Sequence, residues 1–310
     1  MPGKRKEKWI QAREEELLPV PYFHVVFTLP DTLNHLCLYK PDILYSLLFK
    51  TAWSVLNSFG QDPKWLGAQT GMISILHTWG QTLTLHPHLH CIVPAGGLSK
   101  AGKWKVAKTK GKYLFSVKAM SEVFRGRFID GLKEQLPEEI TPDLVNRLYK
   151  HKWVVYAKQP FTGPQSVVEY LGRYTHKIAI SNHRIKNISD EKVSFSYKDY
   201  RHGSIKKDMD LKPMEFIRRY SMHILPKGFV RIRHYGILSS TAKKKAAICI
   251  KQQLPEVPLP IKTRPEPQSF DVKTCPCCKE QTMHALLHFN YRGPPDAYMV
   301  IAADLLYAII

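Results

Sequence analysis

Three histidines stand close together in the segment HPHLH, which begins at His86. Neutral imidazole is the commonest metal ligand in proteins. On a β-strand, side chains two residues apart point to the same face. His86, His88 and His90 would therefore share one face, with Pro87 and Leu89 on the other. This pattern predicts a metal site, and its alternative is the polar face of an amphipathic hairpin.

A metal site that leaves room for a substrate needs a third protein ligand. His77 lies eleven residues before His88, and a tight hairpin turn between them would place it alongside His88 and His90. We therefore predict that His77, His88 and His90 bind the metal. Pro87 weakens regular strand pairing because it has no N–H to donate. His86 is accordingly expected at the start of the strand, off the metal.

Two tyrosines follow some eighty residues later, in the segment EYLGRYTHK. Tyr170 and Tyr174 are four residues apart on a predicted helix, so their hydroxyls would emerge from one face about one turn apart. Tyrosine can act as a covalent nucleophile. Arg173, His176 and Lys177 stand beside them and could hold a phosphate backbone. The alternative is that both rings simply pack against the sheet.

The chain is strongly basic, with 46 Lys and Arg against 26 Asp and Glu, a formal net charge of +20. A folded basic protein with aromatic residues among its cations indicates a nucleic-acid partner. A merely basic, soluble surface is the alternative. Beyond the tyrosine segment, the candidate DNA contacts are Arg184, Arg231 and Arg233. The densest basic stretches are 104–113, 173–186 and 228–236.

The segments HPHLHCIVPAGGLS and EYLGRYTHKIAISNHRI together resemble the two-tyrosine HUH transposases of the IS91 type. HUH denotes histidine, bulky hydrophobe, histidine, which here is His88–Leu89–His90. The resemblance extends over most of the chain, through further blocks such as YFHVVFTLPDTL and LPKGFVRIRHYG. In the family a Cys-rich zinc-binding module usually precedes these blocks, and we expect this sequence to lack it.

The resemblance implies a transposase of an insertion sequence that binds single-stranded DNA at the transposon ends and the target site. It implies Mg²⁺ or Mn²⁺ on His88 and His90, with His77 matching by spacing the third histidine of the relaxase branch. In other branches a Gln or Glu near the tyrosine completes the site, so Gln165 and Glu169 remain rivals.

The tyrosines carry the expected reaction. In the family, a tyrosine nicks the DNA, leaving a 5′-phosphotyrosine and a free 3′-OH, and the second tyrosine permits strand transfer without ATP. Tyr170 and Tyr174 match these two nucleophiles. Two other functions remain open: a DNA-binding remnant of a truncated element without catalysis, and a metal-dependent hydrolase that acts through water.

Strands and helices are mixed, with short hairpin connections, which predicts an α+β fold with a mainly antiparallel sheet. The resemblance implies an HUH endonuclease-like fold, in which helices flank this central sheet. We expect a catalytic domain over 1–251, a Pro-rich linker over 252–270 and a small Cys/His-containing tail over 271–310. Strands are predicted at 22–29, 71–93 (a hairpin turning near Gly80), 104–107 paired with 113–117, 153–158, 177–181 and 192–200. Helices are predicted at 42–59, 119–136, 141–150, 163–174 and 212–225.

The tail holds a Cys-x₂-Cys pair, Cys275 and Cys278, followed by His284 and His288 with H-x₃-H spacing. These four residues are candidate ligands of a structural Zn²⁺. The alternative is an exposed cluster of reduced cysteines. The charged N-terminus lacks the apolar core of a signal peptide, and the apolar segment 297–310 is too short to span a bilayer. We therefore expect a cytoplasmic bacterial protein that associates with the nucleoid and not with a membrane.

Overall fold

The fold is described from a computed structural model of the chain, which divides into two units, Met1–Val257 and Pro258–Ile310. The division falls inside the proline-rich segment. The structure describes residues 17–108, 114–161, 179–254, 273–275 and 277–283.

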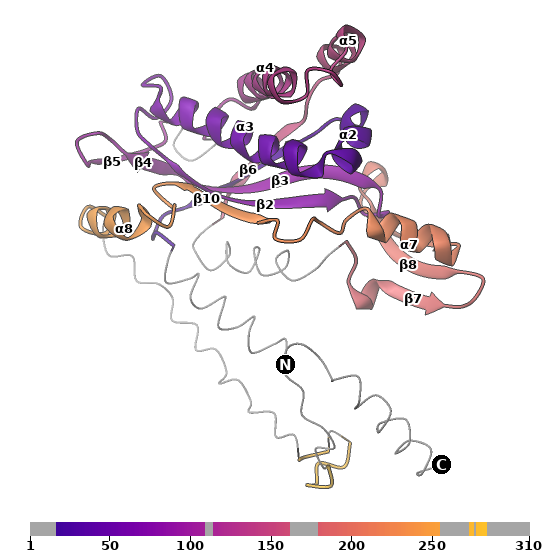
Figure 1. Cartoon of the computed structure of the whole chain (residues 1–310). Coiled ribbons are helices and arrows are strands. Elements are labelled where there is room, and N and C mark those ends of the chain that lie inside the picture. Colours follow the sequence, from indigo (N-terminus) through magenta and orange to yellow (C-terminus); the bar gives the residue numbers. More distant parts are fainter. Residues whose placement is uncertain (1–16, 109–113, 162–178, 255–272, 276, 284–310) are drawn as a thin grey trace. The chain divides into compact units, whose positions relative to one another are not determined.

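A five-stranded antiparallel sheet forms the centre of the first unit (Figure 1). Its spatial order is β10-β2-β3-β1-β6, so β3 lies in the middle with a partner on each side. The predicted α+β class with a central antiparallel sheet is therefore confirmed. The strands are β1 (Tyr22–Thr28), β2 (Gly71–Trp79), β3 (Leu85–Pro94), β6 (Val155–Phe161) and β10 (Ile232–Gly236).

Helices cover one face of this sheet, where α3 and α4 lie side by side (Figure 1). Every second side chain of β1 and β3 enters this layer and is buried, as Phe27 and Leu89 illustrate. From the helices, Phe49 and Phe124 close the same core, which removes large apolar surfaces from water. The helices of this layer are α2 (Asn34–Tyr39), α3 (Pro41–Gln61), α4 (Val117–Gln135) and α5 (Pro142–Lys150).

The other face of the sheet is divided along its length. At one end, Ile75 and Ile92 join a second apolar cluster with Ile237 and with Ile250 of α8 (Lys243–Lys251). At the other end, the same face carries the histidines of β2 and β3. The apolar half of this face packs against the second cluster, and the other half carries the histidines.

A short hairpin formed by β4 (Gly96–Leu98) and β5 (Trp104–Val106) follows β3. The predicted pairing of 104–107 with 113–117 is therefore wrong. Ser99 N donates to Lys103 O, and Gly102 adopts a left-handed φ of 72°, so the chain turns back at once onto the preceding residues. Ser116 begins the next helix instead, because its hydroxyl accepts a hydrogen bond from Ala119 N.

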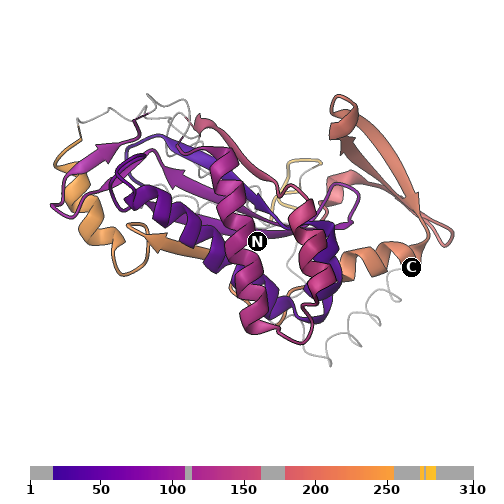
Figure 2. The ribbon, with the colours of Figure 1, turned by 90° about the horizontal axis from the view of Figure 1, so that it is seen from above.

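A second, three-stranded sheet in the order β7-β8-β9 projects from one end of the unit, beside α7 (Figure 2). Its strands are β7 (Ile185–Ile188), β8 (Val193–Asp199) and β9 (Ile205–Leu211), and the helix is α7 (Pro213–Ser221). The strand predicted at 177–181 is not formed by its described residues, since 179–181 lie outside any strand. The strands over 185–188 and 205–211 were not predicted.

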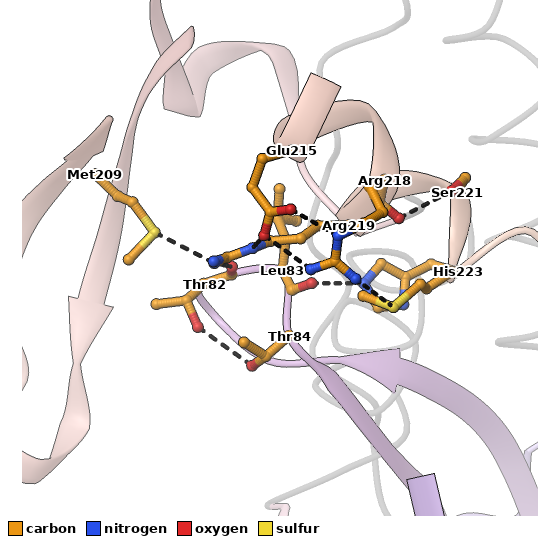
Figure 3. A network of polar contacts seen from close by, with 10 residues as sticks. Thr82, Leu83, Thr84, Met209, Glu215, Arg218, Arg219, Ser221 and His223 are labelled. Atoms are coloured by element: carbon orange, nitrogen blue, oxygen red, sulfur yellow. Dashed lines mark hydrogen bonds and ion pairs between the residues drawn. The ribbon is translucent and has the colours of Figure 1, made fainter. Parts of the chain in front are cut away.

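The turn between β2 and β3 is clamped from the side of α7 (Figure 3). Arg219 donates from Nη1 to Thr82 O at 3.1 Å, and Glu215 holds the same guanidinium by an Nε–Oε1 contact of 2.7 Å. His223 donates from Nε2 to Leu83 O at 3.1 Å. The two carbonyls of this tight turn therefore receive donors from a segment more than 130 residues away.

Residues of the small sheet, and Arg184 directly before it, contact the same turn. Arg184 donates to Gln81 O at 2.6 Å and to Ser196 O at 2.7 Å. Leu83 adopts a left-handed φ of 60° and is fully buried in a cluster with Phe195. A leucine rarely adopts this backbone conformation, so the surrounding contacts must compensate for its cost.

We expect that Leu83→Ala lowers the free energy of unfolding by about 2 to 4 kcal/mol, because it empties a buried leucine site without relieving the left-handed backbone. Urea unfolding followed by circular dichroism measures this loss. The matched control is Thr84→Ala in the same turn, where the side chain is exposed and the change should stay within about 0.5 kcal/mol. An equal effect of both substitutions would show that Leu83 does not anchor the turn.

Candidate metal centre

The central hairpin brings the predicted metal ligands together. His77 of β2 lies directly opposite His88 of β3, and His90 lies two residues further along the same face. The pairing is irregular just beyond His77, next to Pro87, as the sequence predicted. The turn spans 80–84, and its left-handed residue is Leu83, whereas Gly80, near which the sequence predicted the turn, does not have a left-handed φ.

The three imidazoles point toward one another. One ring nitrogen from each of His77, His88 and His90 lies within 4.8 Å of the other two. The Nε2 atoms of His88 and His90 are 3.1 Å apart. Within the described part of the chain, this is the group of three His, Cys, Asp or Glu side chains whose atoms converge closely enough to hold a metal ion.

Burial keeps these histidines neutral. It lowers the pKa of His88 to about 4 and holds the pKa of His77 and His90 well below the ordinary value. The neighbouring His88 and the positive charge of Arg231 lower the pKa of His77 further. Each neutral imidazole keeps one nitrogen lone pair, so metal binding requires no loss of a proton from these histidines at neutral pH.

The outer ring nitrogens of His88 and His90 contact the main chain and β1, respectively. His88 donates from Nδ1 to His86 O at 2.6 Å, while the side chain of His86 is exposed. His24, on β1, places its Nε2 2.8 Å from Nδ1 of His90. Sequence reasoning missed His24. The signal was present, because the predicted strand at 22–29 carries a single histidine amid mostly apolar residues.

The donor set fits a divalent transition metal. Imidazole nitrogen suits Fe²⁺, Ni²⁺, Cu²⁺ and Zn²⁺, whereas Mg²⁺ prefers oxygen ligands and keeps its water. Three converging neutral imidazoles therefore match a divalent transition metal, and of the two ions expected from the sequence only Mn²⁺ belongs to that class.

The predicted nucleophiles Tyr170 and Tyr174 lie outside the described residues. The same holds for the cations beside them, Arg173, His176 and Lys177, and for the rival metal ligands Gln165 and Glu169.

The three remaining candidate DNA contacts are placed differently from one another. The guanidinium of Arg184 donates hydrogen bonds to the carbonyls of Ser196 and Gln81, which holds the turn between β2 and β3. Arg233 lies over the Phe49 ring of α3, 4.3 Å from its centroid. Both arrangements indicate a structural use of the side chain. Arg231 is partly buried and acts electrostatically on His77, which places a positive charge beside the histidine cluster.

In the second unit, the chain turns tightly around the Cys-x₂-Cys pair. Lys279 N donates to Cys275 O at 2.9 Å, and Lys279 adopts a left-handed φ of 65°. Backbone N–H groups of Cys278 and Cys277 lower the pKa of the Cys275 thiol. Cys275 and Cys278 are free thiols. The two other predicted zinc ligands, His284 and His288, lie outside the described residues.

We expect the metal-free protein to lose stability as the pH falls from about 6.5 toward 4. The unfolded chain binds a proton at His88 near pH 6.5, whereas the native pKa is about 4, so acid favours unfolding across this window. Urea midpoints measured at several pH values test this. His88→Gln should flatten the slope, and an unchanged slope in that variant would contradict the assignment.

None of the described helices combines the length and the apolar character needed to cross a membrane.

The fold and its histidine cluster define an α+β protein that carries an HUH element on the central strand of an antiparallel sheet. The chain belongs to the transposase family described as "Putative transposase", whose family model matches residues 71–246. This match spans the histidine hairpin, the predicted tyrosine segment and the small sheet.

Two curated relatives are also described as transposases. The chain is 39% identical to "Putative transposase y4qJ" of Sinorhizobium fredii, over 94% of this chain and 80% of the relative. It is 29% identical to the transposase for insertion sequence element IS801 of Pseudomonas savastanoi pv. phaseolicola, over 76% of this chain and 59% of the relative.

Among solved structures, the chain is similar to the conjugative relaxase TrwC in complex with oriT DNA in its metal-bound form. The TM-score is 0.30 and the identity 8%, over 75% of this chain and 72% of TrwC. A second TrwC complex, with mutant oriT DNA, gives a TM-score of 0.28 at 9% identity, over 73% and 72% of the two chains.

Residues 2–29 also match a family model described as "Transposase zinc-binding domain". The sequence was expected to lack this module, and the match shows that a stretch related to it is present. The expectation that the module is lacking is therefore wrong for residues 2–29. Residues 2–29 contain no cysteine.

Proposed function

We propose that this transposase nicks single-stranded DNA and transfers the cut strand through a 5′-phosphotyrosine intermediate. The observation that carries the proposal is the convergence of three neutral imidazoles on the HUH element of an insertion-sequence transposase. A site of this kind can bind a divalent ion beside a phosphate. Membership of the family makes the chain a transposase, and the tyrosine nucleophile and its phosphotyrosine intermediate are our proposal.

In this proposal His77, His88 and His90 hold the metal, whose chemistry is to polarise a non-bridging oxygen of the scissile phosphate. The hydroxyl oxygen of Tyr170 or Tyr174 attacks the phosphorus and loses its proton to water, which balances the proton that the leaving oxygen takes up. The bond from phosphorus to the 3′ oxygen breaks, and that oxygen leaves as a 3′-OH after it takes up a proton. The phosphodiester energy is conserved in the tyrosine ester, so strand transfer needs no ATP. Gln165 and Glu169 stay alternatives to His77 as the third ligand.

Single-stranded DNA at the element ends and at the target is the proposed partner, because the chain carries a net charge of +20 and its family acts on DNA. Neutralised phosphates release counterions, so the affinity should fall steeply with salt. Arg231, beside His77, is the described cation that we assign to the DNA near the metal. Binding of chromosomal targets would place the protein in the bacterial nucleoid.

The test is a covalent-capture assay. The protein is incubated with single-stranded oligonucleotides that cover the element end, labelled at the 3′ end, together with Mn²⁺. A labelled band that migrates with the protein on a denaturing gel supports the proposal. If the protein binds the DNA but forms no adduct with any divalent metal tried, its function would be that of a DNA-binding remnant without catalysis. Cleavage without an adduct would indicate attack by water.

We further propose that Cys275 and Cys278 bind a structural Zn²⁺ together with His284 and His288. The tight turn around Cys275 and the N–H groups directed at its sulfur support this, because such a turn stabilises a thiolate. Purified protein should contain Zn²⁺ that the variant with Ser at both cysteines lacks. Equal zinc contents in the two proteins would refute the site.

A further inference from the structure

His24 lies behind the metal centre, on the neighbouring strand β1. Its Nε2 is 2.8 Å from Nδ1 of His90, which is the nitrogen that does not face His88. The two rings are nearly parallel, at 14°, with centroids 5.0 Å apart. This centroid separation is what two coplanar rings need when they are joined edge to edge, so the contact has the geometry of an in-plane hydrogen bond.

The strand register fixes this pair. Val26 is directly opposite His90, and His24 is two residues away on the same face of β1. His24 is 8% exposed, so its ring has little freedom to leave. The contact therefore follows from the sheet itself and does not depend on a mobile side chain.

The direction of the hydrogen bonds can be deduced from the main chain. His86 O can only accept, so His88 carries its proton on Nδ1 and presents a lone pair at Nε2. That Nε2 is 3.1 Å from Nε2 of His90, so His90 must donate there and carries its own proton on Nε2. Nδ1 of His90 is then the acceptor, and His24 donates to it from Nε2.

This arrangement cannot bind a metal, because a ligating nitrogen must offer its lone pair and Nε2 of His90 carries a proton. For His88 and His90 to bind the same ion through Nε2, the proton of His90 must move to Nδ1. Nδ1 would then be a donor, and the Nε2 of His24 must become its acceptor. His24 in turn has to carry its proton on Nδ1.

We propose that His24 is a positioning residue that changes tautomer together with His90 when the metal binds. The number of protons is unchanged, because the proposed change moves protons between ring nitrogens and neither adds nor removes one. Only the ring positions of two protons differ. The inference rests on the proposed metal role of His88 and His90, and it adds a required partner behind the ligands.

Outer partners of metal-binding histidines typically change metal affinity by about 10- to 100-fold. His24→Phe keeps an apolar ring of similar shape but offers no acceptor, so Mn²⁺ should bind about 10- to 100-fold more weakly. His24→Gln should stay close to the wild type, because an amide can donate in one state and accept in the other. His35→Phe, at an exposed histidine of α2, controls for loss of an imidazole elsewhere.

The experiment measures Mn²⁺ affinity by electron paramagnetic resonance, without DNA, after circular dichroism has shown that each variant is folded. The protein labelled with ¹⁵N-histidine then reports the tautomers by NMR. In the wild type, addition of Zn²⁺ should move the protons of His90 and His24 from Nε2 to Nδ1.

Four outcomes decide the proposal. Weak binding by His24→Phe with rescue by His24→Gln, and a joint tautomer change in the wild type, supports it. Equal Mn²⁺ affinity of wild type and His24→Phe overturns it while leaving the metal site intact. Equally weak binding by both His24 variants also overturns it, since His24 would then be a ligand. Failure of the wild type to bind Mn²⁺ at all refutes the proposed metal role as well.

Discussion

The variant with phenylalanine at both Tyr170 and Tyr174 is expected to form no covalent adduct with DNA. Phenylalanine keeps the ring and removes the attacking oxygen, so the rate of cleavage should fall by on the order of 10³-fold or more. DNA binding should remain, because the charge of the protein is unchanged. The measurement is the covalent-capture assay, paired with a gel-shift assay for binding.

The single variants order the two nucleophiles. Loss of the adduct in Tyr170→Phe but not in Tyr174→Phe would make Tyr170 the first to attack, and the reverse result would assign Tyr174. If the double variant still cleaved DNA at the wild-type rate, the tyrosine mechanism would be refuted and attack by water would replace it.

Metal binding should depend on His88 and not on the neighbouring side chain of His86. We expect His88→Ala to weaken Mn²⁺ binding by more than about 100-fold, because one of three converging imidazoles is lost. The same variant should form no adduct with DNA. Titration calorimetry with Mn²⁺ measures the first effect directly.

His86→Ala is the matched control. It removes an exposed imidazole and keeps the main-chain carbonyl that accepts the hydrogen bond from Nδ1 of His88. Mn²⁺ affinity should be nearly unchanged in this variant. A comparable loss of Mn²⁺ affinity in His86→Ala and His88→Ala would mean that the two histidines contribute equally to the site. That result would contradict the assignment of His88, and not His86, as a ligand.

The hairpin that carries the site could be predicted because its information is local. Alternation along the strand and the spacing between His77 and His88 suffice to bring the histidines to one face. His24 could not be assigned in this way. Its place beside His90 depends on β1 pairing with β3 in one register, and the two residues are 66 positions apart.

The turn and the small sheet show a different limit. The sequence placed the turn near Gly80, yet the left-handed residue is Leu83, which contacts from α7 and the small sheet hold in that conformation. Likewise, Gly131 weakens the helix pattern of α4 by propensity. In the fold it permits a close approach, since a Cβ there would lie 2.4 Å from Leu47 of α3. Such contacts are not encoded locally.

The position of β3 in the strand order has a consequence for amide hydrogen exchange. β10 and β6 are the edges of the five-stranded sheet, and each has one neighbour, whereas β2, β3 and β1 are paired on both sides. Edge strands open in partial unfolding events that leave the centre closed. The backbone amides of His88 and His90 should therefore exchange only through global unfolding, so the site would stay assembled while the sheet frays around it.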